Sequence, residues 1–595
     1  MNKKRSIFHL FNWTYFFFFI LFIVLVNVIA SFIYFRYDAT EDKRYSLAEG
    51  TVEYLQDDKH FKDRLLFKIY LEGNLPAEVR RFRNAVEDKL KEFKEYAGKR
   101  IEYQFIDPTE GSEQDRLALF ENIYQKGKGI VPMELLYNKD GSQTQMMLWP
   151  GAVIEYLGST VNYVQLIPGT PQGKYYQLNE GFEQQMQNSI NNLEYILISS
   201  IRRSTQQKKE KIAFLQGHGE LTYAQTQRVR TLISPYFVVE DVFLKDSLDA
   251  LKEYKGLVIA RPTQAFSDKD KYIIDQFLMR GGRLMCFIDK LNINKDTLKA
   301  NGVTHTMRYP LELDKMLFDY GIKVNDNYVI DVRCAPMAIP SSKQPLIPWF
   351  YDVLATPTKH PISRNIEPVI LRYVSEIQFV GNSNRVAQPI LTSSTNSAMT
   401  GLAPLVSLSM PLTYGPKPIL VQNPEDENNK LCLAGLVEGY FESHFKNRLV
   451  DAFAKNPETK YKEKSSAEGK VLVMGNGRFI ENKYDSIPDK NGNWMYRAKA
   501  FNELRFDETM SNIPGMQPLV YGNQEFFQNL VDYMMGDQSV LDIRSKQIDI
   551  HALDKEKITA HATFYKWLNM SIPSLLILIL AISVNYIRRR KYTRH

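Results

Sequence analysis

The sequence predicts an α/β fold with open, mostly parallel sheets in a large body, flanked by one transmembrane helix at each end. Two observations predict this class. Long apolar segments without charged residues lie near both ends of the chain, and between them short apolar strands alternate with amphipathic helices. Such alternation is typical of an open parallel α/β sheet.

The two apolar segments are residues 13–35 and, after a short linker within 559–587, residues 567–587. Each has about the twenty residues that a helix needs to cross the bilayer core. The first segment continues well past the small residue Ala30, so we expect an uncleaved signal anchor rather than a cleaved signal peptide. The body is therefore expected to be tethered to a lipid bilayer at both ends.

Basic residues flank both apolar segments. The N-terminal tail (1–12) and the C-terminal tail (588–595) contain eight lysines and arginines and no acid, whereas the whole chain has a net charge of +7, so the remainder sums to −1. Basic flanks stay in the cytoplasm, which predicts cytoplasmic tails and an extracytoplasmic body. A nucleic-acid-binding body would need its own positive surface, so no nucleic-acid partner is expected. The alternative of a nucleic-acid-binding tail is disfavoured because the arginine run abuts a span.

The body exceeds one ordinary domain. We predict a juxtamembrane stalk (36–60), a first α/β domain (61–205) and a second α/β domain (206–558) of flavodoxin or amidotransferase type with long loops. In the first domain, strands at 65–71 and 101–106 enclose a helix, which predicts a parallel β-α-β unit. Further strands and a long polar helix follow, at 133–137, 146–148, 153–157, 162–167 and 178–203.

The second domain repeats the alternation. Ser267 and Asp270 resemble a capping box at the start of a helix that stops at Gly281-Gly282. Residues 284–288 are continuously apolar, as expected for a strand covered on both faces, and they include Cys286 as a core residue. Other predicted strands are 212–215, 237–242, 257–260 and 470–475, and other predicted helices are 222–233, 313–320 and 526–535.

Three segments give weaker signals. The proline-rich segment 336–361 is either an extended surface that contacts a partner or a connection packed on the body. Residues 456–470 and 480–515 are predicted to be polar or charged loops.

The strongest candidate for chemistry is Gly217-His218-Gly219-Glu220, which follows a strand and precedes a helix. Ligands of open α/β sheets bind at the carboxyl ends of strands, and a histidine and a glutamate there could act as base and acid or hold a metal. The structural alternative is that the glycines permit a tight turn and His218 caps or packs. Gly475-Asn476-Gly477 is a lone G-x-G and is predicted to be structural only.

Other catalytic signatures are missing from the sequence. Residues 169–175 resemble a P-loop but are one residue too short, and Tyr175 stands where the Mg²⁺-binding serine or threonine belongs. The chain is therefore not expected to hydrolyse ATP. It has neither H-E-x-x-H nor G-x-S-x-G. We predict no catalytic residue, no cofactor site and no metal site.

Small and polar residues lie on one side of each span, which permits close helix packing in lipid. We hypothesise that these stripes contact each other or a separate multi-span protein; the alternative is that such residues are merely tolerated near membrane ends. They are Asn27, Ser31 and Tyr34 in the first span and Ser574, Ala581 and Asn585 in the second.

Five segments together resemble a known family: 37–47, 214–220, 281–284, 438–443 and the basic ending 588–592. This combination resembles the GldG family, the gliding-motility-associated ABC-transporter auxiliary proteins of the Bacteroidota. The resemblance implies an inner-membrane subunit with a periplasmic body that works with a multi-span permease subunit and a cytoplasmic ATPase subunit in gliding motility. A periplasmic envelope protein is a further implied partner.

The sequence thus predicts a non-catalytic auxiliary subunit that couples permease and ATPase to a periplasmic partner or ligand. Two alternatives stay open. One is a membrane-anchored periplasmic hydrolase or glycan-binding protein that uses the loop of His218 and Glu220. The other is a structural scaffold of the cell envelope.

Overall fold

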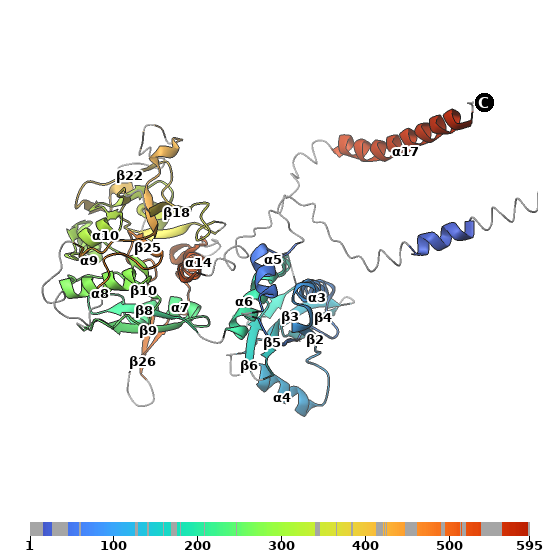
Figure 1. The fold of residues 1–595 in the computed structure, drawn as a ribbon, viewed down its shortest axis with the longest axis horizontal. Helices are drawn as coiled ribbons and strands as arrows, with labels where there is room; N and C mark the ends of the chain where they lie inside the picture. Colours follow the sequence, from blue (N-terminus) through green and yellow to red (C-terminus); the bar gives the residue numbers. More distant parts are fainter. Residues whose placement is uncertain are drawn as a thin grey trace, which may run out of the picture. The chain divides into compact units, whose positions relative to one another are not determined.

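The computed structural model forms two compact units, one of residues 1–44 and 547–595 and one of residues 45–546 (Figure 1). It describes residues 16–25, 46–58, 61–124, 129–139, 142–158, 160–167, 175–178, 180–206, 209–245, 247–338, 346–364, 366–381, 385–411, 421, 423, 425–446, 461–488, 494–511, 513, 519–536 and 562–592.

The first unit contains apolar helices. Helix α17 (Ala562–Tyr592) covers the second predicted span, and its segment Lys566–Ile587 is long and apolar enough to cross a membrane. Ser574, Ala581 and Asn585 lie on this helix at the predicted spacing. A shorter apolar helix, Phe16–Leu25, is the described part of the first predicted span. Asn27, Ser31 and Tyr34 lie outside the described residues.

The first domain of the second unit contains the predicted β-α-β unit. Strands β1 (Leu65–Ile69) and β2 (Ile101–Phe105) pair in parallel across α3 (Ala77–Ala97), whose apolar face is buried. Strands β5 (Gly151–Tyr156) and β6 (Thr160–Gln165) complete a sheet of order β2-β1-β5-β6, and both join it antiparallel. Other elements are α2 (Glu49–Gln56), η1 (Gly98–Arg100), α4 (Glu113–Tyr124), β3 (Met133–Lys139), β4 (Ser142–Leu148) and β7 (Tyr175–Gln177).

The single long polar helix predicted at 178–203 is wrong. The chain forms two helices, α5 (Glu180–Asn191) and α6 (Leu193–Thr205), and much of α6 is buried in the domain core. The break lies at Asn192, whose backbone amide and side-chain amide both donate to the carbonyl of Asn188, at 3.1 and 2.9 Å.

The second domain contains a ten-stranded sheet. Five neighbouring strands are parallel, in the order β9-β8-β10-β11-β25, as the sequence predicts for this part. Their bounds are β8 (Lys211–Gln216), β9 (Val238–Phe243), β10 (Gly256–Ala260), β11 (Arg283–Phe287) and β25 (Gly469–Met474).

Helices cover both faces of this parallel block. Ile212 and Phe214 of β8 share a core with α7 (Tyr223–Ile233) and α14 (Asn523–Met535). The alternate residues of the same strand, Ala213 and Leu215, pack with α8 (Asp268–Met279) on the other face. The predicted capping box starts α8: Ser267 Oγ accepts from the Asp270 amide, at 3.1 Å. Cys286 is buried, as predicted.

The prediction of mostly parallel sheets is wrong, because the other half of the large sheet is antiparallel. Parallel neighbours need a crossover of about a dozen residues or more, usually a helix. After Pro357 the chain instead returns beside the same strand, in antiparallel pairing that begins at Val369. The antiparallel strands are β17 (Cys334–Ala338), β18 (Leu346–Pro357), β19 (Val369–Arg372), β21 (Arg385–Thr392) and β24 (Cys432–Gly439).

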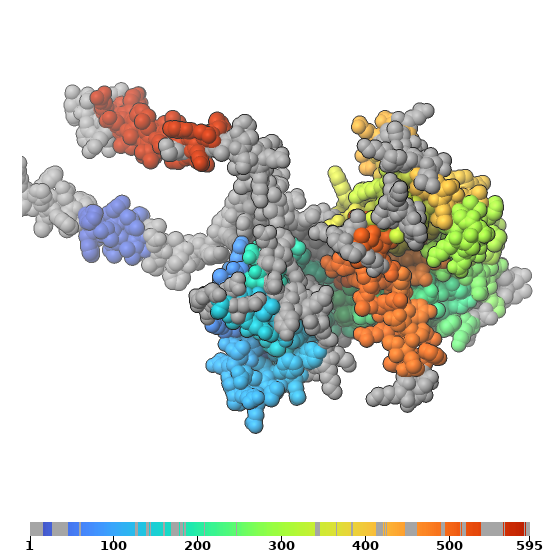
Figure 2. Space-filling view, turned by 180° about the vertical axis from the view of Figure 1, so that it is seen from behind, coloured from blue at the N-terminus to red at the C-terminus, as the bar shows by residue number. Residues whose placement is uncertain are grey.

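The proline-rich segment contributes β17 and β18, and Trp349, Phe350 and Tyr351 are buried. Its described part is therefore a packed connection rather than a surface for a partner. The prediction of loops at 480–515 is wrong in its middle, where β26 (Tyr484–Pro488) and β27 (Trp494–Ala498) form an antiparallel hairpin that projects from the body (Figure 1). The orange segment that includes β27 lies at the surface in Figure 2, and Trp494 is 62% exposed.

Smaller elements complete the second domain. They are β12 (Leu291–Asn292), α9 (Lys295–Asn301), β13 (Val303–His305), β14 (Met307–Arg308), α10 (Asp314–Asp319), β15 (Ile322–Val324), β16 (Val329–Asp331), β20 (Ile377–Phe379), β22 (Ser397–Met399), β23 (Leu405–Ser407), η3 (Glu427–Asn429) and α13 (Glu508–Ser511).

Candidate functional site

The loop of Gly217, His218, Gly219 and Glu220 connects β8 to α7 and is packed against the next loop of the sheet edge. The carbonyl of His218 accepts from the amides of Thr263 and Gln264, at 2.8 and 2.9 Å. Gly219 has φ +76°, and a Cβ there would lie 2.0 Å from Thr263 Oγ1. A glycine is therefore required at this position for the loop to approach its neighbour.

The His218 imidazole is held at both nitrogens. Nδ1 lies 3.1 Å from Glu220 Oε1, Nε2 lies 3.3 Å from Asp270 Oδ2, and the ring stacks on Phe266. Burial alone would lower the pKa of His218, but the hydrogen bonds to Glu220 and Asp270 outweigh it and raise this pKa above its ordinary value.

These contacts give the loop a structural role. The Glu220 carboxylate is buried and also accepts from the His218 amide, at 2.6 Å. Asp270 belongs to α8, so the imidazole ties the start of α7 to the start of α8. A base needs a free ring nitrogen, and both are engaged here. The geometry favours the structural alternative for this loop. Among the described residues, no group of three or more His, Cys, Asp or Glu has an arrangement suited to a metal ion.

A polar cavity of about 630 Å³ lies beyond the carboxyl end of β25. The loop after β25 contributes Asn476, the middle residue of the G-x-G that the sequence marked as structural only, and Arg478, which follows it. Sequence reasoning missed this site because its other walls come from distant segments. The lining residues are Gln225, Lys295, Pro336, Asp352, Ile370, Arg372, Asn476, Arg478, Phe479, Glu481, Asn482, Lys483, Tyr484, Lys499, Glu503, Leu504, Phe506, Asp507, Glu508, Thr509 and Asn523.

The two glycines of this loop are structural, as predicted, because the backbone passes very close to its neighbours. A Cβ at Gly475 would lie 2.0 Å from the carbonyl oxygen of Ser375, and one at Gly477 would lie 2.8 Å from the amide of Asp289. The residues between and after the glycines are the ones that face the cavity. Asn476 is fixed there because its side-chain amide donates to the Arg372 carbonyl, at 2.8 Å.

The Asp289 carboxylate holds the loop after β25 in place beside the cavity. Asp289 lies two residues after the end of β11 and accepts from the Gly477 amide, at 2.6 Å. Its carboxylate also lies 3.3 Å from Arg261 Nε and 3.6 Å from Arg478 Nε. Burial raises the pKa of Asp289, against the opposing charges of Arg478 and Arg261. A buried carboxylate between two guanidinium groups holds both of them in place.

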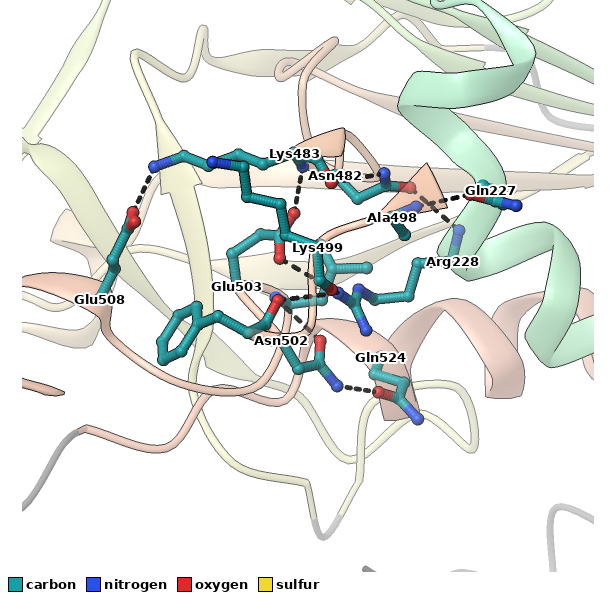
Figure 3. A network of polar contacts seen from close by, with 12 residues as sticks. Gln227, Arg228, Asn482, Lys483, Ala498, Lys499, Asn502, Glu503, Glu508 and Gln524 are labelled. Atoms are coloured by element: carbon teal, nitrogen blue, oxygen red, sulfur yellow. Dashed lines mark hydrogen bonds and ion pairs between the residues drawn. The ribbon is translucent and has the colours of Figure 1, made fainter. Parts of the chain in front are cut away.

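A network of hydrogen bonds fixes the wall formed by the hairpin base (Figure 3). The Asn482 side chain accepts from the Arg228 amide and donates to the Ala224 carbonyl, each at 2.9 Å. The Arg228 side chain donates to the carbonyls of Lys499 and Phe501, at 2.7 and 2.8 Å. These contacts join β26 and β27 to α7, so this wall of the cavity has a defined position.

Two non-glycine residues near these charges have left-handed backbone conformations. Arg261 has φ +55° and Tyr373, which follows the cavity residue Arg372, has φ +58°. Such conformations are uncommon outside glycine and concentrate at ligand-binding and active sites. Together with the charges, they mark this cavity rather than the His218 loop as the candidate binding site.

Comparisons with known proteins match two parts of the chain. Residues 209–512 match a family described as an ABC-type uncharacterized transport system, and residues 41–155 match a domain of unknown function (DUF7088). The first match spans just over half of the 595 residues and includes the parallel block and most of the cavity lining.

An uncharacterized protein of Borreliella burgdorferi is 22% identical over 336 residues, which cover 54% of this chain and 60% of that relative. The chain thus matches about three-fifths of the relative's length. Among solved structures, the mmIFT52 N-terminal domain aligns with a TM-score of 0.27 and 11% identity, over 46% of this chain and 88% of that domain.

Proposed function

Because the chain belongs to the auxiliary family of ABC-type transport systems, we propose that it is a non-catalytic subunit that couples a permease and an ATPase to a ligand or partner outside the cytoplasm. The family match over residues 209–512 is the observation that carries this proposal. It supports an accessory role in transport, and the coupling is our inference.

The apolar helices support a membrane anchor for this subunit. Helix α17 has the length and composition of a span, and five basic residues follow Ile587. In the proposed topology both tails are cytoplasmic, and the body lies in the periplasm of a cell with an inner and an outer membrane. The resemblance to the GldG family supports a role in gliding motility.

In this arrangement each subunit has a separate role. The ATPase chain hydrolyses ATP, since this sequence has no complete P-loop. The permease contacts the spans through stripes of small and polar residues such as Ser574, Ala581 and Asn585. The periplasmic body then receives a ligand or an envelope protein.

Affinity purification from mild detergent tests the proposal. The tagged full-length chain should bring down both a permease and an ATPase. Ala581→Leu should reduce permease recovery, because a large side chain on the stripe prevents close helix packing. Ser583→Leu is the matched control, since two residues turn a helix by about 200° and so place this change on the opposite side. The proposal fails if neither protein is recovered with the wild-type chain.

A further inference from the structure

We propose that the polar cavity at the carboxyl end of β25 binds a small molecule through its phosphate or carboxylate group, and that Lys295, Arg372 and Arg478 hold this oxyanion. This inference goes beyond the proposed function, because membership of a transport family does not state what the body binds.

Three cations from separate segments line the cavity, whose charged lining also includes Lys483, Lys499, Asp352, Glu481, Glu503, Asp507 and Glu508. Lys295 begins α9, Arg372 ends β19 and Arg478 belongs to the loop after β25. The Lys295 ammonium lies 5.7 Å from the centre of the Tyr373 ring. Desolvation and the positive charge of Arg478 lower the pKa of Lys295, and Arg372 contributes in the same direction, while the charges of Asp352 and Glu481 oppose this shift. An incoming oxyanion would relieve this repulsion among like charges.

Buried acids orient the two arginines without covering them. Asp352 Oδ2 lies 3.3 Å from Arg372 Nε, and Asp289 Oδ2 lies 3.6 Å from Arg478 Nε. In both pairs the closest contact is made by Nε, and a terminal nitrogen of Arg478 also lies 3.8 Å from Glu481 Oε2. A fixed guanidinium that presents its terminal nitrogens matches a phosphate or carboxylate in two-point contact.

The order of exposure distinguishes an anion site from a cation site. The side chain of Arg372 is 39% exposed and that of Asp352 is 19% exposed, so the cation lies nearer the open space. In the second pair, the side chain of Arg478 is likewise more exposed than that of Asp289. In another charged cavity, of about 770 Å³, the order is mixed: Asp268 is more exposed than Lys271, at 68% and 14%, whereas Arg308 is more exposed than Asp314, at 53% and 44%. The first arrangement suits an anion.

The size of the cavity fits a small polar molecule. Its volume of about 630 Å³ lies within the range of roughly 300–1,000 Å³ that is usual for small-molecule sites. Asn476, Gln225 and Asn523 add amide groups to the lining, and Phe479 and Phe506 add aromatic rings. The ligand therefore has an uncharged polar part beside its oxyanion.

Calorimetric titration of the full-length chain in detergent tests the site with three probes that share one ring. They are glucose 6-phosphate, glucuronate and glucose, at matched ionic strength. We expect saturable binding of at least one charged probe and none of glucose, and the two charged probes distinguish a phosphate from a carboxylate. The proposal is overturned if neither charged probe binds, or if glucose binds equally well.

Variants locate the binding. Arg372→Gln and Arg478→Gln should each weaken it about tenfold or more, because each removes a charged hydrogen-bond donor. Lys299→Gln, one turn further along α9, is the matched control and should bind as the wild type does. Arg478→Lys keeps the charge beside Asp289, so it tests the site even if Arg478→Gln lowers the melting temperature. Unchanged affinity in both Arg372→Gln and Arg478→Lys would overturn the proposal. Recovery of permease and ATPase is measured separately, so failure here leaves the proposed function standing.

Discussion

Two loops at the same edge of the parallel sheet differ: one is closed by contacts with the chain itself, and the other lines a cavity. The loop after β8 contains His218 and is closed by contacts with the chain's own Thr263, Gln264 and Asp270. The loop after β25 contains Asn476 and Arg478, which line an open cavity. A position at the carboxyl end of a parallel strand therefore makes a site only where the neighbouring loops leave space.

Glycines serve both loops in different ways. Gly219 lets the first loop approach a side chain, Thr263, and the approach brings the backbone carbonyl of His218 onto two amides. Gly475 and Gly477 let the second loop approach the backbone beside Ser375 and Asp289, and the side chains between and after them extend into the cavity. Close packing at a glycine thus leaves no open space at the first loop, whereas at the second loop it places side chains in a cavity.

The largest expected effect comes from Asp289→Ala. It leaves Arg261 and Arg478 without their buried carboxylate, so we expect a loss of about 3–5 kcal/mol in the free energy of unfolding. Chemical denaturation measures this loss. The exposed Asp249→Ala should change the free energy by less than about 0.5 kcal/mol. Equal stability of the two variants would show that Asp289 does not organise the second loop.

His218→Gln should cost about 1.5–3 kcal/mol at acidic pH, because the imidazolium bonds to two carboxylates. The pKa of His218 is raised in the folded state, so its contribution is full below the ordinary value of 6.5 and is lost as the pH rises through the folded value. Denaturation of the wild type and the variant from pH 5.5 to 9 checks this. A stability difference that stays constant over this range would contradict the contacts assigned to His218.

Asn482→Ala sharpens the comparison with a smaller effect, about 1–2 kcal/mol, because it removes two side-chain hydrogen bonds to the backbone of α7. It should also weaken binding in the cavity, since the hairpin base forms one wall. Trp494→Ser, on the exposed part of the same hairpin, is the control and should change stability by less than about 0.5 kcal/mol. Binding that is weakened equally by both variants would argue against a fixed wall.

Several local patterns predicted the local structure correctly, although the single helix at 178–203 was wrong. The parallel pair β1–β2, the five-stranded parallel block and the capping box of Ser267 and Asp270 all follow from periodicity and short-range signals. The antiparallel half of the sheet was missed: β17, β18 and β19 pair with their neighbours in the chain but lie in a proline-rich region without clear alternation, and β21 and β24 pair across longer intervals. The hairpin at 484–498 had a usable signal: Asn491-Gly492 lies between two segments rich in aromatic and β-branched residues.

The candidate site was harder to predict. The sequence drew attention to Gly475-Asn476-Gly477. Its importance depends on residues from other segments that no local pattern links to it. Asp352 and Arg372 come from the antiparallel half that the sequence did not reveal, and Lys295 begins a short helix. Charges that meet only through tertiary pairing leave no spacing to recognise in one sequence.

One titration compares the two loops directly: glucose 6-phosphate and glucuronate are each titrated into the His218→Gln variant and into the Arg478→Lys variant. We expect His218→Gln to bind a charged probe with wild-type affinity despite its lower stability, and Arg478→Lys to bind it more weakly. Weaker binding by His218→Gln together with unchanged binding by Arg478→Lys would place the site at the first loop and contradict this account.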